Sequence, residues 1–293
     1  KFCLECLEKS RLSCHDPIII MKFSIIIPNY NGEAFIENVV KKLLDGFINV
    51  EIVVVDDAST DKSVEIIKSI KNNKVYLIQK SDNGGFASAV NRGLQHCKER
   101  GVKFVIVANS DIDVMPGNFP DIVKSFCEFE QKSVGVLGFL ESGDKTYKEN
   151  ENISGFLFAL RLSVIDKVGY LDETFYMYGE EQDFFRRVIS CGYKIKQTGV
   201  KIKHNSEMSG NCSSNNSWLS IRNSIYLEVK RKNWILIIRK VFVLFLLINR
   251  IYRVKNREDN SLIRITRPGI LKGNVYLFKA IIWNFNKMRH DND

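Results

Sequence analysis

The sequence predicts an α/β fold in which a mostly parallel sheet is flanked by helices. Short runs of β-branched and aromatic residues alternate with longer stretches whose apolar residues recur at helical spacing. Strands are predicted at 23–27, 51–55, 75–78 and 104–108, and the helices between them at 34–44, 63–70 and 86–100. Because strands joined through a helix lie parallel in one sheet, this order indicates βαβ units.

The pattern is less regular after residue 115. Helices are predicted at 116–131 and 180–191, and strands at 134–139, 155–162 and 201–203. The polar stretch 141–152 is expected to form a loop. A second polar stretch, 205–217, is rich in Ser, Asn and Gly, which makes it a candidate for a lid over a binding site.

The composition is that of a globular protein with a basic charge. The chain has 293 residues, of which 45% are hydrophobic, enough for one large core or one core with a small appendage. A net charge of +9 favours anionic partners such as phosphorylated small molecules, phospholipid head groups or nucleic acid. The sequence has no zinc-finger, helix-turn-helix or RNA-recognition pattern, so we expect no nucleic-acid partner.

Residues 1–20 are expected to be an upstream extension outside the fold, which begins at Met21. The spacing of Cys3, Cys6, Cys14 and His15 would also fit a zinc knuckle, the alternative for this segment. The segment has no apolar run long enough for a signal peptide. The 7 cysteines of the chain are odd in number and mostly scattered, which indicates thiols in a reducing compartment.

The region 233–293, which follows a predicted domain at 21–232, is expected to be helical, basic and apolar. Its unbroken apolar run, 241–248, is far shorter than the about 20 residues needed to span a bilayer. Basic residues flank this run, namely Lys230, Arg231, Lys232, Arg253, Lys255 and Arg257. Because these cations would have no role in a core, we expect an interfacial helix on an anionic membrane. The alternative is a helix buried against the domain.

Polar clusters follow the predicted strands, and the carboxyl ends of parallel strands share the rim where ligands bind. Asp111 and Asp113 come directly after the strand at 104–108. Paired carboxylates suit a divalent cation such as Mg²⁺ or Mn²⁺, which also binds substrate phosphates. A cation there would neutralise a diphosphate leaving group. Taken alone, the same pattern also fits a capping turn.

Two further clusters are candidates for contacts with a nucleotide. Asp56 and Asp57 follow the strand at 51–55. Ser59, Thr60 or Asp61 could cap the helix that follows. Because two adjacent acids cannot both cap, we expect one of Asp56 and Asp57 to be left for a base edge or ribose. Asn83 and Gly85 open the helix at 86–100, where glycine allows close approach and the helix N-terminus favours an anion. An ordinary turn is the alternative for this glycine pair.

A third acidic cluster opens the helix at 180–191. It contains Glu180, Glu181 and Asp183. Acids are favoured at a helix N-terminus by the helix dipole, which is one explanation for them. The other is a general base at the edge of the same cleft, placed to deprotonate an acceptor hydroxyl.

Together these motifs resemble the inverting glycosyltransferases of family 2, which have the GT-A fold. The resemblance covers roughly residues 21–232 and depends on five segments in the family's order. They are the opening strand and nucleotide loop at 24–32, the second-strand motif at 53–61, the glycine loop at 83–93, the metal motif at 109–113 and the acidic motif at 179–187. Five motifs in register are much more specific than any one of them.

The resemblance implies a role for each matching position. The residues that would contact the nucleotide sugar are Pro28, Tyr30, Asn31, Asp56, Asp57, Asn83, Gly85, Asn91 and Asp111. Asp111, Asp113 and His204 would hold the cation. Glu181 lies where the family has its catalytic base. The family usually has Asp at this position, so the side chain here is longer by one methylene. Glu180 and Asp183 remain alternatives for the base.

Three segments, 83–87, 178–183 and 222–230, are also similar to rhamnosyltransferase-like enzymes of bacterial surface polysaccharide assembly. The implied reaction moves a sugar from a nucleotide-diphosphate donor to a glycan or a lipid-diphosphate-linked acceptor. It would take place in the cytoplasm, at the inner face of the plasma membrane. A nucleotidyltransferase and a non-catalytic relative are the alternatives. The former would need a glycine-rich basic loop, where this chain has Pro28, Asn29, Tyr30 and Asn31.

Overall fold

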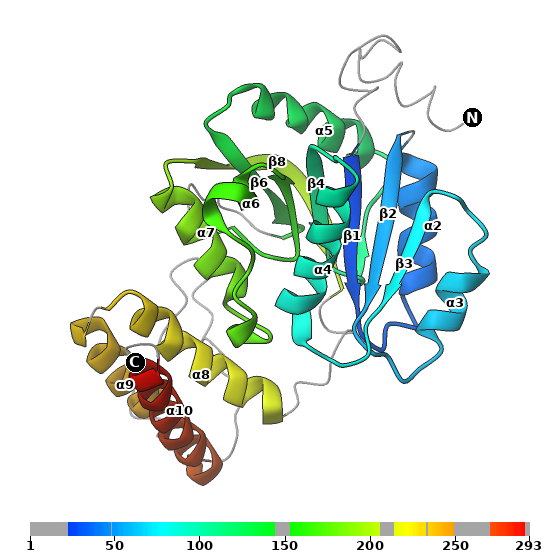
Figure 1. Cartoon of the computed structure of the whole chain (residues 1–293). Coiled ribbons are helices and arrows are strands. Elements are labelled where there is room, and N and C mark those ends of the chain that lie inside the picture. The colour runs from blue at the N-terminus through cyan, green and yellow to red at the C-terminus, as the bar shows by residue number, and fades with distance from the viewer. Residues whose placement is uncertain are drawn as a thin grey trace. The chain divides into compact units, whose positions relative to one another are not determined.

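The computed structural model of the protein describes residues 23–47, 49–143, 153–205, 214–232, 234–248 and 270–290 (Figure 1). The chain divides into two compact units. The first unit comprises Lys1–Tyr176 and Glu180–Ser209, and the second comprises Met177–Gly179 and Gly210–Asp293. The predicted domain at 21–232 ends with a helix, α8 (Ser214–Lys230), which belongs to the second unit.

Among the described residues, the first unit is built on one mixed sheet of eight strands in the order β3-β2-β1-β4-β7-β6-β8-β5. Figure 1 labels the strands β1, β2, β3, β4, β6 and β8. The strands are β1 (Phe23–Asn29), β2 (Val50–Asp56), β3 (Val75–Gln79), β4 (Phe104–Ala108), β5 (Ile112–Asp113), β6 (Val134–Glu141), β7 (Leu157–Arg161) and β8 (Lys194–His204). The strands β3, β2, β1 and β4 are parallel neighbours. The strands β4, β7 and β6 are antiparallel, and β8 is parallel to β6.

The sheet register brings the ends of the strands together at one rim. The strand β1 pairs with β2 along its whole length, so Asn29 lies opposite Asp56 where both strands end. The short strand β5 pairs with the end of β8, which places Ile112 opposite His204. Residues that are far apart in the sequence therefore become neighbours through backbone pairing.

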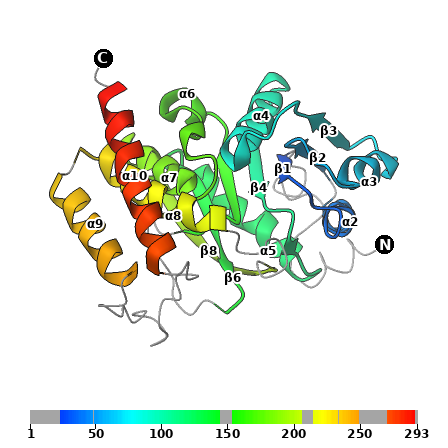
Figure 2. The ribbon, with the colours of Figure 1, turned by 90° about the horizontal axis from the view of Figure 1, so that it is seen from below.

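Helices cover both faces of the sheet. They are α2 (Ile36–Gly46), α3 (Ser63–Ser69), α4 (Gly85–Glu99), α5 (Asn118–Ser125), α6 (Val164–Val168) and α7 (Glu180–Ser190), with 3-10 turns η1 (Phe126–Glu130) and η2 (Glu173–Phe175). Side chains alternate along a strand, so β1 supplies two cores: Ile25 and Ile27 pack with α2 and α5, and Ile26 packs with α4, α6 and α7. Figure 2 shows α4 and α6 on one side of the sheet, with α2 and α5 on the other.

In the part of the second unit that the structure describes, three helices pack on one another: α8 (Ser214–Lys230), α9 (Trp234–Ile248) and α10 (Ile270–His290) (Figure 2). The α8–α10 contact is specific. Asn284, which is buried, donates to the carbonyl of Arg222 at 3.1 Å, and the Arg222 guanidinium lies over the Trp283 ring, 4.5 Å from its centre. Within the described residues, none of the helices combines the length and the apolar composition needed to cross a bilayer.

The predicted fold class is confirmed, because the sheet, the flanking helices and a C-terminal helical region are all present. The predicted strands and helices up to residue 108 match elements of the structure within two residues. The helices α6 and α8 and the strand β5 were not predicted, whereas α9 and α10 lie in the region 233–293 that was predicted to be helical. The predicted loop at 141–152 lies mostly outside the described residues, as do 1–20 and most of 205–217, whose last four residues instead begin α8.

The contact between α4 and β1 leads to a testable prediction about stability. A Cβ on Gly93 would lie 2.5 Å from Cγ2 of the buried Ile26. Ala normally stabilises a helix by about 1 kcal/mol relative to Gly, whereas overpacking a core costs about 1–3 kcal/mol. We expect Gly93→Ala to lower the free energy of unfolding in denaturant titrations. Gln95→Ala on the exposed side of α4 is the matched control, and equal stability of the two variants would contradict the tight contact.

Candidate active site

Two loops at the rim, after β1 and β2, are joined by side-chain hydrogen bonds. The buried Asn29 donates to Asp56 at 3.0 Å. Asp56 also accepts from the backbone N–H and the hydroxyl of Ser59, at 3.1 and 2.6 Å. Asn31, whose φ is 51°, accepts from the N–H of Thr60 at 2.8 Å. These bonds hold both loops in one shape and leave the Tyr30 side chain 50% exposed beside them.

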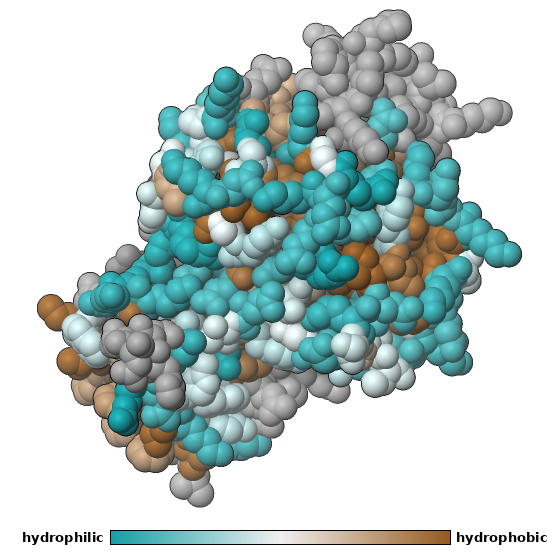
Figure 3. Space-filling model, viewed as in Figure 1, coloured by the Kyte–Doolittle hydropathy of each residue, from teal (hydrophilic) through white to brown (hydrophobic). Residues whose placement is uncertain are grey.

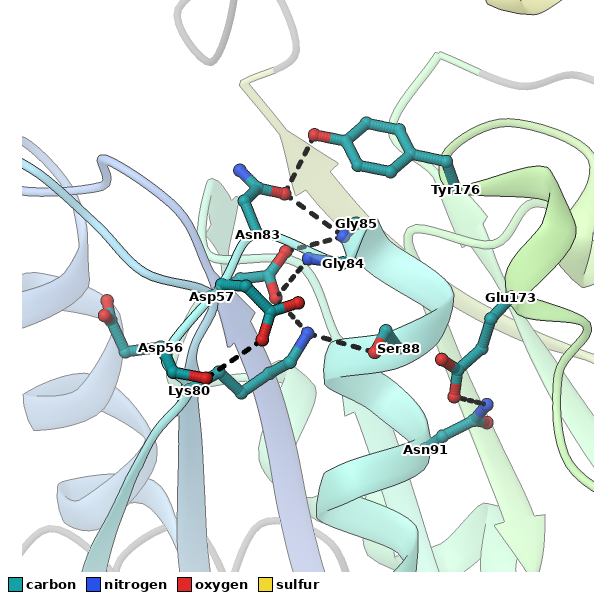
Figure 4. Close-up of polar contacts among 12 residues, drawn as sticks. Asp56, Asp57, Lys80, Asn83, Gly84, Gly85, Ser88, Asn91, Glu173 and Tyr176 are labelled. Atoms are coloured by element: carbon teal, nitrogen blue, oxygen red, sulfur yellow. Dashed lines mark hydrogen bonds and ion pairs between the residues drawn. The ribbon is translucent and has the colours of Figure 1, made fainter.

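Asp57 is buried and forms the centre of a second network, shown in Figure 4. Its carboxylate accepts from the N–H of Gly85 at 2.7 Å and from the N–H of Gly84 at 3.2 Å, at the start of α4. It also forms an ion pair with Lys80, whose ammonium group donates to Ser88 at 3.0 Å. Asp57 therefore caps a helix that begins 28 residues later in the sequence.

This network corrects one step of the sequence argument. Asp56 and Asp57 were expected to share one capping role, which would leave one carboxylate available for a ligand. In the structure both accept backbone N–H groups, because Asp56 caps its own turn and Asp57 caps α4. The expectation was wrong because sequence distance hides the proximity of β2 to the start of α4. A role for either acid in nucleotide binding is untested and stays a prediction.

Tyr176 lies against the glycine loop. Its hydroxyl donates to Oδ1 of Asn83 at 2.8 Å, and that oxygen also accepts from the N–H of Gly85 (Figure 4). A side chain on Gly85, whose φ is +82°, would collide with the Tyr176 carbonyl. Burial raises the pKa of Tyr176, and the nearby charge of Asp57 raises it further. The glycine therefore permits a close approach between this loop and the chain just before α7.

Asn91 has a structural position in α4. It is buried, donates to the carbonyl of Leu171 at 2.9 Å and to Glu173 at 2.8 Å, and accepts from the N–H of Leu171 at 3.0 Å. These bonds fix the segment that leads into η2 and Tyr176. The predicted contact of Asn91 with a nucleotide sugar is untested.

Asp111 and His204 meet through the β5–β8 pairing. The buried carboxylate of Asp111 lies 3.1 Å from Nε2 of His204, and Nδ1 of the same ring lies 3.5 Å from Glu141. Phe156 stacks on the imidazole, with ring centres 5.0 Å apart. Burial lowers the pKa of His204, but the hydrogen bond to Asp111 and the charges of Asp111 and Glu141 outweigh burial, so this pKa is raised.

Asp113 is oriented differently from Asp111. Its carboxylate forms an ion pair with Lys42 of α2 at 2.5 Å, and 20% of its side chain is exposed. The described residues contain no group of three or more His, Cys, Asp or Glu side chains arranged to hold a metal ion. Divalent cations that also bind substrate phosphates need only one or two protein carboxylates, and carboxylate oxygens suit Mg²⁺ and Mn²⁺. Asp111 offers such a carboxylate, and His204 places an imidazole nitrogen beside it.

The three acids at the start of α7 have different surroundings. Asp183 is buried and pairs with Arg187 at 2.8 Å. Glu180 is buried, and burial together with the charge of Glu181 raises its pKa to about 8. Glu181 is half-buried and passes over Gly155, where an added Cβ would meet its Cγ at 2.7 Å. At neutral pH, Glu180 is therefore mainly protonated.

Close backbone approaches connect these clusters into one rim. A Cβ on Gly32, after β1, would lie 3.7 Å from the Ser110 hydroxyl, so the first loop reaches the Asp111 loop. The N–H of Asn109 donates to the carbonyl of Phe156 at 2.9 Å. Phe156 stacks on His204 and follows Gly155, which contacts Glu181. The structure thus brings the Asp111–His204 pair and Glu181 to neighbouring positions.

Two residues of this site, Lys80 and Tyr176, were missed in the sequence. Lys80 directly follows β3, so it lies on the same rim as the ends of β1 and β2. A charged residue at that point could have indicated a partner for Asp57. Tyr176 has a φ of 64°, which a non-glycine residue rarely adopts and no sequence pattern reveals.

Comparison with known proteins identifies the family. Residues 24–210 match the profile of "Glycosyl transferase family 2". The chain is also similar to the minor teichoic acid biosynthesis protein GgaA of Bacillus subtilis (strain 168), with 34% identity over 130 residues. That match covers 42% of this chain and 29% of GgaA, so the chain corresponds to less than a third of that relative.

Two solved structures have the same fold. The mannosyltransferase PcManGT from Pyrobaculum calidifontis, in complex with GDP-Man and Mn²⁺, superposes with a TM-score of 0.59 at 16% identity, covering 98% of this chain and 80% of that one. Residues 1–349 of S. aureus TarS in complex with UDP give a TM-score of 0.54 at 21% identity, covering 78% and 71%. The match to the family profile extends over most of the first unit, from β1 to beyond β8, and the chain belongs to glycosyl transferase family 2.

Proposed function

We propose that the protein is an inverting glycosyltransferase that moves a sugar from a nucleotide-diphosphate donor to an acceptor hydroxyl. The proposal rests above all on the Asp111–His204 pair, which lies 3.1 Å apart and is connected through Phe156 and Gly155 to Glu181. Candidate ligands for a cation and a candidate general base thus lie on one rim of the sheet. Membership of family 2 supports the reaction class.

The donor would bind along the rim with its base near the first two loops. Tyr30, half exposed, and Pro28 offer apolar surface to a base, and Asn31 is exposed beside them. PcManGT and TarS, in complex with GDP-Man and UDP, have this fold and make a nucleotide donor a consistent choice. The start of α4, with Asn83 and Gly85, offers further polar contacts.

Asp111 and His204 would hold a divalent cation, with Asp113 as a further ligand if it leaves Lys42. A bound Mg²⁺ or Mn²⁺ would neutralise the diphosphate as it departs. The buried Asp111 carboxylate is oriented by His204 and is therefore available in a fixed position. PcManGT contains Mn²⁺, which supports this assignment by analogy of fold.

Glu181 would act as the general base. It would remove the proton from the acceptor hydroxyl while that oxygen bonds to the anomeric carbon and the diphosphate leaves with the bonding electron pair. Asp183 is paired with Arg187, and Glu180 is mainly protonated at neutral pH, so neither suits this role as well.

The acceptor would be a glycan, or a lipid-diphosphate-linked glycan, in bacterial surface polysaccharide synthesis. The name of GgaA refers to teichoic acid biosynthesis, which supports this class. Such a carrier would place the enzyme at the cytoplasmic face of the plasma membrane. The donor sugar is proposed to be a hexose or a 6-deoxyhexose such as rhamnose, because the stretch 178–183 resembles rhamnosyltransferases.

Donor hydrolysis tests this function directly. We expect turnover of one member of a panel of UDP-, GDP- and dTDP-sugars with Mn²⁺ or Mg²⁺, and none with EDTA. Asp111→Asn should lower turnover about a hundredfold or more, since a cation contributes several kcal/mol to leaving-group stabilisation.

Lys42→Gln, which releases Asp113, should lower the Mn²⁺ concentration for half-maximal rate if Asp113 is a ligand. Binding of no nucleotide sugar would favour a non-catalytic protein, and cleavage of a nucleoside triphosphate would favour a nucleotidyltransferase.

The base assignment can be tested with two matched variants. Glu181→Gln should lower the kcat of transfer by about a hundredfold or more, because a general base contributes that much. Glu180→Gln should change kcat much less, because glutamine resembles the protonated acid already present. The affinity for the donor, measured by calorimetry, should be unchanged in both. A larger loss in Glu180→Gln than in Glu181→Gln would reverse the two roles.

The raised pKa of Glu180 also predicts how stability depends on pH. Folded Glu180 keeps its proton up to about pH 8, whereas an ordinary glutamic acid loses it near pH 4.5. The folded state therefore binds more protons between these values, and this group makes stability fall as pH rises through that window. We expect the wild type to lose about 1–2 kcal/mol more than Glu180→Gln between pH 5.5 and 7.5 in denaturant unfolding. Parallel pH profiles of the two proteins would contradict the buried, protonated state.

A further inference from the structure

The helix α9 exposes a continuous apolar stripe. Ile235 is 79% exposed, Ile238 is 69% exposed and Phe242 is 59% exposed. These residues recur at spacings of three and four, so they lie on one side of the helix. Scattered surface apolar residues are common, but a run of large ones along one helix side marks a contact surface.

The helix α10 has a second stripe of the same kind. Phe278, Ile282 and Phe285 repeat at spacings of four and three, and all are exposed. The opposite side of α10 contains the buried Leu277, Ala280 and Asn284, and Asn284 bonds to α8. The apolar stripe of α10 therefore lies on the side turned away from α8.

The two helices adjoin within the second unit. Both pack on α8 and on each other, and Figure 2 shows them side by side. Figure 3 shows hydrophobic side chains on the surface at the lower left, where Figure 1 places α9. We call the set Ile235, Ile238, Phe242, Phe278, Ile282 and Phe285 the apolar face.

The charge of these helices indicates what the face contacts. Neither α9 nor α10 contains a single Asp or Glu. Arg239, Lys272, Lys279 and Arg289 are exposed on them, and Lys240 is half-buried. A surface that combines exposed apolar residues with cations alone matches the interface of an anionic bilayer, where side chains enter the acyl boundary and cations meet the head groups.

We propose that α9 and α10 together form a docking surface for an anionic phospholipid membrane, on which the apolar face inserts at the level of the head groups. This inference deepens the proposed function, because it rests on an acceptor carried by a membrane lipid. It extends the sequence prediction, which expected an interfacial helix in the region 233–293, by naming the side chains of α9 and α10 that enter the membrane. Binding is shallow and reversible, since two short stripes enter the interface without crossing it.

A second copy of the chain fits the same face less well. Two copies joined through it would bring the cations of α9 and α10 together without any acid on these helices to balance them. Like charges in proximity disfavour such an interface. Anionic lipids, by contrast, supply the missing charge.

Vesicle flotation of the full chain tests the proposal. The probes are vesicles of phosphatidylcholine alone and vesicles containing 30% phosphatidylglycerol. We expect the protein to partition into the anionic vesicles at least tenfold more strongly than into the neutral ones. Added salt should weaken its binding to the anionic vesicles. The variant F242S/F278S/F285S changes only exposed side chains, so the fold should be kept, and circular dichroism checks this. It should lower partition at least tenfold, and R239Q/K279Q should lower it several-fold.

The matched control is K68Q/K71Q, which removes two exposed charges from the first unit and should bind vesicles as the wild type does. Equal partition of the wild type into neutral and anionic vesicles would overturn the proposal, as would wild-type binding by F242S/F278S/F285S. A change from dimer to monomer in that variant, with vesicle binding unaltered, would instead assign the face to a second copy. Donor hydrolysis in solution, measured in parallel, shows whether the proposed function fails or only the docking surface does.

Discussion

The carboxylate of Asp57 holds together the part of the sheet on which the site is built. It is buried at the end of β2 and accepts hydrogen bonds from two backbone N–H groups at the start of α4. It also forms an ion pair with Lys80. A buried carboxylate is tolerated only when its oxygens are paired, and the positive end of a helix favours it. The ammonium group of Lys80 would be unfavourable beside that helix end without the carboxylate. Removing either charge would leave the other buried and uncompensated, which is the costly way to break such a pair.

The position of α4 then sets the position of the chain on the other side of the rim. Asn83 at its start binds the Tyr176 hydroxyl, and Asn91 farther along binds Leu171 and Glu173. Both contacts are with the chain just before α7, so the acids of α7 are positioned by a helix that is itself capped from β2. The glycine loop at the start of α4 and the acidic helix α7 are therefore held in fixed positions relative to each other, although their motifs are far apart in the sequence.

The sequence predicts the parallel half of the sheet well because its strands contain apolar runs, such as residues 25–27 of β1 and 52–55 of β2, and its helices have regular apolar spacing. It fails where structure depends on pairing with distant residues. The strand β5 is only two residues long and exists because it pairs with β8, and Asp57 caps α4 from 28 residues away. Among the predicted site residues, Asp111 and His204 meet, whereas Asp113 turns to Lys42, and no local pattern separates these outcomes.

Backbone strain and a buried carboxyl group near α7 support the proposal that this end of the rim carries out the chemistry. Tyr176, Tyr178 and Gly179 have φ values of 64°, 71° and 97°, and left-handed conformations are costly for the two tyrosines. Directly after them, Glu180 is buried with a raised pKa, which also costs stability at neutral pH. A scaffold without activity would gain stability from glycine or asparagine at the strained positions and from glutamine at residue 180. Both costs occur at the same point, next to Glu181 and near the Asp111–His204 pair, which supports the proposed active site rather than the non-catalytic alternative.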